Sequence, residues 1–184
     1  MTIREPICGT AVCLGPLRVA NAAEWVRWME DPETTRYLYA PGERPRERFT
    51  LAVALDWGRR VLADPQRLVF AITERAADRQ VGDARLVPSG RRRARFSIVI
   101  GERTARGRGL GGEATRLVCR YGFEQLDLEQ IDLEVDPRNT AAVRAYLRVG
   151  FERTGRRTMK LTRRRWDAGQ PAASDLATRR APAA

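Results

Sequence analysis

The sequence lacks several features that would mark particular classes of protein. It contains no histidine and a single lysine, Lys160. No apolar run is long enough to span a membrane. Residues 1–6 carry charge that no apolar segment follows, so we expect no signal peptide. The length of 184 residues and the 43% hydrophobic content predict one globular domain over residues 1–166, with a disordered tail over 167–184.

Cysteine is also scarce. The chain has Cys8, Cys13 and Cys119, an odd number whose spacing suits neither a zinc site nor a disulfide framework. We therefore expect no metal, a core position for Cys119 and a reducing, cytoplasmic location.

The net charge of +11 is unevenly distributed. Residues 91–108 hold seven arginines against Glu102, which gives +6, and residues 152–184 hold nine basic against three acidic residues, which also gives +6. The remainder of the chain is therefore −1. A preference for arginine codons explains the near absence of lysine but not the clustering. Two basic clusters point to an anionic ligand or partner.

Hydrophobic periodicity predicts an α+β protein in which an antiparallel meander is followed by βα units. The expected strands cover residues 10–19, 68–73, 81–87, 93–100, 131–135 and 151–161. The expected helices cover residues 22–29, 33–39 (a short helix or turn), 46–63, 110–121 and 140–149.

Several local signals refine this outline. Asn21 is expected to cap the first helix, with Glu24 completing a capping box, and Asn139 is expected to cap the last. Gly150 stands where a helix-ending glycine belongs. Residues 88–90 and the arginines after them are expected to form a hairpin tip. The third helix shows one apolar face: Phe49, Val53, Trp57, Val61.

A glycine-rich stretch over residues 106–113 lies between an apolar strand and an amphipathic helix. Glycines let backbone N–H groups approach a ligand, and the start of a helix adds unpaired N–H groups and the positive end of a dipole. Arg106 and Arg108 add charge. The stretch therefore predicts a site for a phosphorylated ligand.

Two nucleotide-binding motifs fit this stretch poorly. Residues 107–112 match G-x-G-x-x-G, but six residues separate them from the strand and an antiparallel meander precedes them, which disfavours a dinucleotide fold. No Gly-Lys-Ser/Thr follows, which excludes a Walker loop.

Residues 106–111 resemble the Gln/Arg-x-x-Gly-x-Gly/Ala pyrophosphate loop of the GCN5-related N-acetyltransferase (GNAT) family. The family's later motif, an Asn, a Tyr seven residues on and then Gly-Phe, is matched by Asn139, Tyr146 and Gly150-Phe151. Residues 31–38 and 161–166 also resemble the ribosomal-protein (serine/alanine) N-acetyltransferase branch. The resemblance covers roughly residues 10–166.

The resemblance implies a mixed, mostly antiparallel sheet, flanked by helices, that splays open to bind acetyl-CoA as co-substrate. Pyrophosphate would take N–H groups of residues 108–112, and the pantetheine arm would pair with residues 98–100 like an added strand. The implied acetyl-CoA-binding residues are Ile98, Val99, Ile100, Arg106, Gly107, Arg108, Gly109, Leu110, Gly111, Gly112 and Asn139.

The implied reaction is direct attack of a primary amine on the thioester in a ternary complex, which needs neither histidine nor cysteine. Glu134 would be the general base and Tyr146 would protonate the departing thiolate, with a backbone N–H near Val99 stabilising the oxyanion. Glu102 and Asp132 are alternative bases. Tyr146 on an apolar helix face is equally consistent with a core tyrosine.

The acceptor is left open between a protein N-terminus and a small-molecule amine, with specificity expected in residues 33–48 and 88–93. Two other functions remain. The first is a transferase of the same fold that uses aminoacyl-tRNA, gripped by Arg91–Arg95 and Arg163–Arg165. The second is a non-catalytic RNA-binding module. The sequence gives no indication of membrane association and does not indicate a particular oligomeric state.

Overall fold

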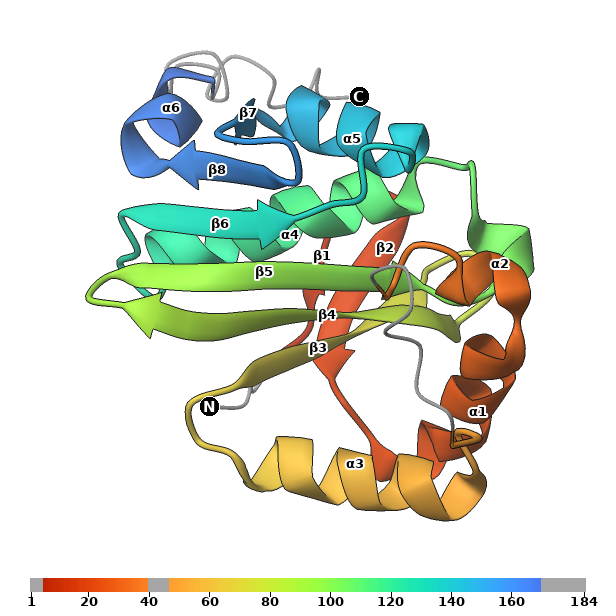
Figure 1. The fold of residues 1–184 in the computed structure, drawn as a ribbon. Helices are drawn as coiled ribbons and strands as arrows, with labels where there is room; N and C mark the ends of the chain where they lie inside the picture. Colours follow the sequence, from red (N-terminus) through yellow and green to blue (C-terminus); the bar gives the residue numbers. More distant parts are fainter. Residues whose placement is uncertain (1–4, 40–46, 170–184) are drawn as a thin grey trace, which may run out of the picture.

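A computed structural model describes residues 5–39 and 47–169. The described part forms a sheet of eight strands in the order β1-β2-β3-β4-β5-β6-β8-β7, with helices on both faces (Figure 1). The strands are β1 (Ile7–Cys8), β2 (Val12–Pro16), β3 (Leu68–Glu74), β4 (Arg79–Gly90), β5 (Arg93–Ile100), β6 (Gln130–Glu134), β7 (Glu152–Arg153) and β8 (Thr158–Thr162). The helices are α1 (Ala22–Glu30), α2 (Pro32–Thr35), α3 (Leu51–Ala63), α4 (Leu110–Glu124), α5 (Thr140–Val149) and α6 (Arg163–Ala168), with short 3-10 turns at Val19–Asn21 and Arg103–Ala105.

The pairing of β5 divides the sheet. All neighbouring strands are antiparallel except β5 and β6, which are parallel and stay in register only as far as Phe96 opposite Leu133. On its other side β5 pairs with β4 as far as Ile100. Ser97–Ile100 therefore has no described strand on the β6 side, which confirms the expected mixed, mostly antiparallel sheet that splays open.

Two hydrophobic cores hold the helices against the sheet. The larger core lies under α4 and α5, and α4 runs behind β5 and β6 in Figure 1. The smaller core packs α1 and α3 against residues of β3 on the opposite face. The α4 face of β5 is therefore covered through Ala94 and Phe96, whereas Arg93, Arg95 and Ser97 on its other face are exposed.

The third helix is shorter than its pattern predicted. It begins at Leu51, because the Thr50 hydroxyl accepts a hydrogen bond from the Val53 N–H and caps it. Residues 47–50 are not helical, and residues 40–46 lie outside the described part. The expected apolar face is confirmed only in part: Val61 is buried and Trp57 packs against the smaller core, whereas Val53 is exposed. Ala54 and Gly58 are buried instead, and Gly58 lies so close to the Trp25 ring that a side chain there would collide with it.

The tip of the long hairpin was also misplaced. β4 runs through Pro88 to Gly90, which pairs with Arg93, so the turn consists of residues 91–92. Pro88 is tolerated because the register shifts there, and proline occurs in sheets at such bulges.

The expected strand over 151–161 is instead a hairpin of β7 and β8. After it, the Thr162 side chain caps α6, whose Trp166 is buried, so the expected tail begins inside a helix. The remainder of that tail, residues 170–184, lies outside the described part. Asn21 makes no capping bond either; its amide donates to the Gln80 side chain.

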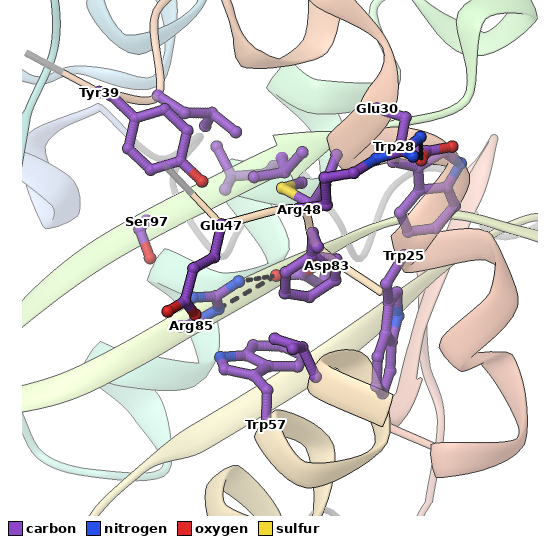
Figure 2. Close-up of a pocket in the computed structure, with 16 residues that line it drawn as sticks. Trp25, Trp28, Glu30, Tyr39, Glu47, Arg48, Trp57, Asp83, Arg85 and Ser97 are labelled. Atoms are coloured by element: carbon purple, nitrogen blue, oxygen red, sulfur yellow. Dashed lines mark hydrogen bonds and ion pairs between the residues drawn. The ribbon is translucent and has the colours of Figure 1, made fainter. Parts of the chain in front are cut away.

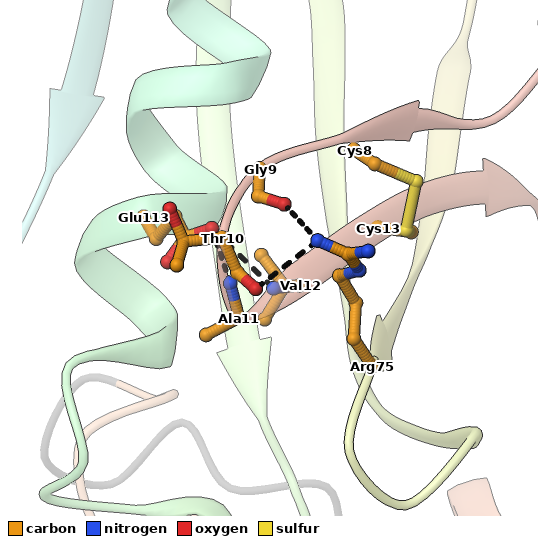
Figure 3. The surroundings of a disulfide bond; sticks show 8 residues. All are labelled: Cys8, Gly9, Thr10, Ala11, Val12, Cys13, Arg75 and Glu113. Atoms are coloured by element: carbon orange, nitrogen blue, oxygen red, sulfur yellow. Dashed lines mark hydrogen bonds between the residues drawn. A yellow bond between two sulfur atoms is a disulfide. The ribbon is translucent and has the colours of Figure 1, made fainter. Parts of the chain in front are cut away.

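Cys8 and Cys13 form a disulfide, so the expectation that their spacing suits no disulfide was wrong. The four residues between them in sequence are folded into the β1–β2 hairpin, where the two cysteines lie directly opposite with Cα atoms 4.0 Å apart (Figure 3). Pairing across a hairpin depends on register and not on spacing alone. Cys119 is fully buried in the larger core, as expected.

Candidate active site

The glycine loop presents a row of free backbone donors. Gly107 and Gly109 have φ of 74° and 84°, the left-handed region that glycine tolerates best, and Gly109 caps α4. The N–H groups of Gly112 and Glu113 bond to the Gly109 carbonyl, whereas those of residues 107–111 donate to no described residue. Free N–H groups at the positive end of a helix are suited to a phosphate.

The open edge of β5 lies next to this loop. The Ile100 carbonyl accepts a hydrogen bond from Arg106 Nε at 3.2 Å, so it points away from β4 and toward the split. Because backbone groups of alternate residues point to opposite sides of a strand, Ile98 offers its N–H and C=O to the same side. Val99 instead faces its partner Asp83 on β4. An extended ligand arm can therefore pair with Ile98 while its anionic end lies at the loop.

Arg106 points away from the free N–H groups of the loop. Its guanidinium donates to Asp31 Oδ2 at 2.5 Å, to the Gly101 carbonyl at 2.7 Å and to the Thr34 hydroxyl. These contacts tie the loop to the junction of α1 and α2, and the Arg106 hydrogen bond lowers the pKa of Asp31 to about 2. Arg108, half exposed, pairs with Glu74 at 2.6 Å. Both arginines expected at phosphate thus already have carboxylate partners.

Tyr146 lies beside the point where the pairing of β5 and β6 ends. Its ring packs against Phe96, with centroids 6.2 Å apart, and against Phe151 at 5.9 Å. Gly150, with φ of 114°, ends α5 in the left-handed conformation, and the Phe151 N–H bonds back to the Tyr146 carbonyl. The Gly-Phe motif therefore holds Tyr146 in place. Burial raises the pKa of the Tyr146 hydroxyl.

Glu134 lies on the other face of the sheet from Tyr146. It alternates with the buried Leu133, its side chain is 55% exposed, and its carboxylate is 3.4 Å from Arg95. The two residues expected to act on protons thus approach the split from opposite faces.

The other expected site residues have clear local contacts. Asp132 pairs with Arg93 at 3.2 Å, and Glu102 pairs with Arg27 at 2.7 Å. Asn139 caps α5 by accepting from the Ala142 N–H at 3.1 Å, as expected.

A cavity of about 950 Å³ opens on the Glu134 face of the sheet (Figure 2). Its walls are formed by α1, by the segment after α2, by the residues just before α3 and by α3 itself. Its floor is formed by β4 and β5. Residues Leu38, Tyr39, Glu47 and Arg48 of the expected specificity segment line it; no described residue of 88–93 does. Aromatic residues dominate the walls: Trp25, Trp28, Tyr39, Phe49, Trp57.

The floor of the cavity carries an ion pair that the sequence interpretation missed. Asp83 is opposite Val99 and Arg85 is opposite Ser97, so all four face the cavity. Asp83 is 4% exposed, and Arg85 contacts it from Nε and NH2 at 3.1 and 2.9 Å. The sequence signal that could have identified this ion pair is the presence of two charged residues, Asp83 and Arg85, at alternate positions of an otherwise apolar strand.

The basic clusters are largely neutralised by neighbouring acidic residues. Arg92 contacts Asp127 and Glu129, both at 2.8 Å, and Arg163 contacts Asp127 at 3.1 Å. Arg93, Arg95 and Arg165 also have carboxylate partners. Clusters that look strongly positive in the sequence are thus interleaved with carboxylates in the fold.

Within residues 5–39 and 47–169, no helix is long and apolar enough to cross a membrane. The same residues contain no group of three or more histidine, cysteine, aspartate or glutamate side chains that could hold a metal ion.

Comparisons with known proteins agree with this geometry. The N-acetyltransferase 9-like protein of Nematostella vectensis is 23% identical over 157 residues, which are 79% of this chain and 76% of that protein. The structure of Vibrio cholerae spermidine N-acetyltransferase in complex with CoA and spermine has a TM-score of 0.75 at 19% identity, covering 86% of this chain and 99% of that one.

The structure of Mycobacterium smegmatis RimJ in complex with CoA-disulfide has a TM-score of 0.73 at 20% identity, covering 91% and 88% of the two chains. Residues 11–152 match the family model described as an acetyltransferase (GNAT) domain. The chain therefore belongs to the GNAT acetyltransferase family.

Proposed function

We propose that this protein transfers an acetyl group from acetyl-CoA to a primary amine. The observation that carries the proposal is the split beside β5, where the open edge of residues 97–100 leads to the free N–H groups of residues 107–111. That arrangement fits a long ligand with an amide-bearing arm and a pyrophosphate. Acetyl-CoA has both parts and supplies an activated thioester.

The loop backbone, more than its arginines, would hold the pyrophosphate. The N–H groups of residues 107–111 are free, whereas those of Gly112 and the guanidinium of Arg106 are engaged within the protein. Ile98 would pair with the pantetheine arm, with Ile100 and Val99 forming the edge around it. Asn139, as the cap of α5, would fix the helix that carries Tyr146.

The catalytic roles follow from the two faces of the split. Glu134, exposed on the cavity face, would take the amine proton through water as the nitrogen attacks. Tyr146 would give its proton to the sulfur as the carbon–sulfur bond breaks. Its raised pKa keeps the hydroxyl protonated at neutral pH, which is the state a general acid needs. Because the N–H of Ile98 points into the split, it would stabilise negative charge on the acetyl oxygen, which leaves the Ile98 C=O to pair with the pantetheine arm.

Donor binding is the decisive test. We expect CoA to raise the melting temperature and to bind in calorimetry, because a ligand that binds only the folded state stabilises it by mass action. Gly109→Ala is expected to weaken CoA binding, since a side chain in the left-handed region costs about 1–2 kcal/mol per residue. Absence of saturable CoA binding to the wild-type protein would overturn the proposal.

The acceptor is a protein N-terminus or a small-molecule amine in this proposal. A tRNA-dependent or RNA-binding function gains no support from the arginine clusters, because Arg92, Arg93, Arg95, Arg163 and Arg165 all have carboxylate partners.

A cytoplasmic location stays a prediction, and the Cys8–Cys13 bond argues against it, because disulfides are rare in reducing compartments. Labelling of free thiols in intact cells, followed by mass spectrometry of the protein, tests whether Cys8 and Cys13 are oxidised in its compartment.

A further inference from the structure

The floor of the cavity holds a carboxylate that the proposed mechanism does not use. We propose that Asp83 is the acceptor-binding residue: its Oδ1 receives the primary ammonium group of the substrate and positions the nitrogen at the split. This assigns the acceptor to the class of cationic primary amines. The assignment rests on the proposed acetyl transfer and specifies which substrates it takes.

The two oxygens of Asp83 are used unequally. Both hydrogen bonds from Arg85 go to Oδ2, and no described residue donates to Oδ1. The Asp83 side chain is 6% exposed, so its charge is largely removed from water. A buried carboxylate needs hydrogen-bond donors on both oxygens, and an ammonium supplies up to three N–H donors and a compensating charge.

Arg85 fixes the carboxylate without blocking it. The Arg85 Cζ lies 4.8 Å from the centroid of the Trp57 ring, which lies below the ion pair in Figure 2. This stacking and the two bonds to Oδ2 hold the Asp83 carboxylate in one orientation. A cationic ligand then meets a fixed negative oxygen.

The aromatic walls suit the same ligand. Tyr39 and Phe49, both partly exposed, line the cavity, and Trp57 lines it with its ring already in contact with the Arg85 guanidinium. Aromatic faces attract ammonium groups by about 0.5–2 kcal/mol, depending on desolvation. The cavity of about 950 Å³ has room for more than a bare amine, such as an alkyl chain or the first residues of a peptide.

The position of Asp83 relative to the split is suitable for the reaction. Its backbone pairs with Val99, on the strand whose other edge is open. Adjacent strands lie about 4.8 Å apart, so a ligand held on Asp83 lies about one strand spacing from β5 and about two from a donor arm paired along its open edge, a distance that the acceptor and the acetyl-bearing end of the arm would bridge together. Glu134, which pairs with Arg95 at 3.4 Å, faces the same side of the sheet and would take the proton through water, which leaves Asp83 to bind and orient.

The experiment measures amine affinity by tryptophan fluorescence, with and without saturating CoA. The probes are 1,5-diaminopentane, the peptide Ala-Gly-Gly with a free amino terminus, and 1,5-pentanediol as the uncharged counterpart. We expect saturable binding of at least one amine and none of the diol. Asp83→Asn is expected to raise the Kd at least tenfold. Preference between the amines tells a small-molecule acceptor from a peptide N-terminus.

Two further variants separate ligand binding from a structural ion pair. Asp83→Asn combined with Arg85→Gln removes both charges, so a merely structural pair would regain affinity, whereas an acceptor-binding Asp83 leaves the double variant as weak as the single one. Asp136→Asn is the matched control, because Asp136 also pairs with the arginine two residues on, at 2.8 Å, yet lies outside the cavity lining. Its amine affinity should equal that of the wild type.

Several results would overturn the assignment. The first two are a double variant that binds amines with wild-type affinity and an Asp83→Asn variant whose Kd is within twofold of the wild-type Kd. The others are binding of the diol as tight as that of the amines, or no saturable binding of either amine up to about 50 mM, a concentration typical of very weak ligand affinities. CoA binding is measured separately by calorimetry. A protein that binds CoA but no amine contradicts the Asp83 assignment alone, whereas a protein that does not bind CoA contradicts the proposed function.

Discussion

Tyr146 has two contrasting features at the residue scale. Its ring belongs to the larger core, packed on Phe96 and Phe151, while its position beside the end of the β5–β6 pairing brings it next to the split. A tyrosine held by its ring and by the turn at Gly150 has little freedom to move its hydroxyl. Such a group is prepositioned for one proton transfer.

Tyr146→Phe keeps the ring and removes the hydroxyl. We expect kcat to fall by about 10²- to 10⁴-fold, the range for loss of general acid catalysis, with the Kd for CoA unchanged. Thiol release with an accepted amine measures the rate, and calorimetry measures CoA binding. A rate within twofold of wild type would leave Tyr146 as a core residue only.

Asp31 and Arg106 form the residue-scale link between the glycine loop and the α1–α2 junction. Because Arg106 lowers the pKa of Asp31 from 3.8 to about 2, the ionised carboxylate stabilises the fold. That contribution is complete above pH 4 and is lost as the pH falls toward 2.

We expect Asp31→Asn to be less stable than wild type at neutral pH and the difference to shrink between pH 4 and pH 2. Urea unfolding of both proteins across this range measures the effect. A difference that stays constant over those pH values would contradict the linkage.

At the scale of elements, the β1–β2 hairpin supports the start of α4. Glu113, in the first turn of α4, accepts from the Ala11 N–H at 2.8 Å and from the Val12 N–H at 3.4 Å (Figure 3). Arg75 donates to the Gly9 carbonyl at 2.9 Å from the other side. The disulfide closes the same turn, so it stiffens an element that contacts the helix behind the glycine loop.

Replacing Cys8 and Cys13 together by serine is expected to lower the free energy of unfolding by ~2 kcal/mol, the entropic value for so short a loop. We also expect weaker CoA binding, because the contacts to Glu113 loosen. Urea unfolding and calorimetry measure the two effects, with reduced wild-type protein as the comparison. Identical unfolding of oxidised, reduced and variant protein would show that the bond adds no stability.

At the scale of the whole molecule, the net charge of +11 overstates the positive surface near the site. The arginines at the start of β5 lie beside acidic residues of β6 and of the turn before it. Parallel pairing of β5 with β6 produces this match, since it sets Arg93 and Arg95 opposite Gln130 and Asp132 in register.

We therefore expect no RNA to remain on the protein purified at about 0.15 M salt, because neighbouring carboxylates offset most of the arginine charge and phosphate contacts weaken steeply with salt. The ratio of absorbance at 260 and 280 nm measures the RNA that remains on the protein. Titration with a labelled 30-nucleotide RNA, long enough for about two to seven single-strand sites, measures RNA binding directly. Saturable RNA binding at that salt would restore the RNA-dependent function.

Local signals in the sequence identified the residues of the proposed donor side. Gly109 and Gly150 adopt left-handed conformations that glycine tolerates best, and Asn139 caps the helix that follows it. Alternation identified the strand of residues 93–100 and the face of Glu134. Each of these features depends on residues within a few positions of one another, so a single chain is enough to reveal it.

Only the tertiary structure decided the proposed acceptor side and the cross-links. Trp57, expected on a core stripe, packs against the smaller core and also lines the cavity. Asp83 faces the cavity. Arg106 contacts Asp31, which is 75 residues away in the sequence. Cys8 meets Cys13 only because the register of two short strands aligns them. These contacts join segments that no periodicity relates, so packing alone determines them.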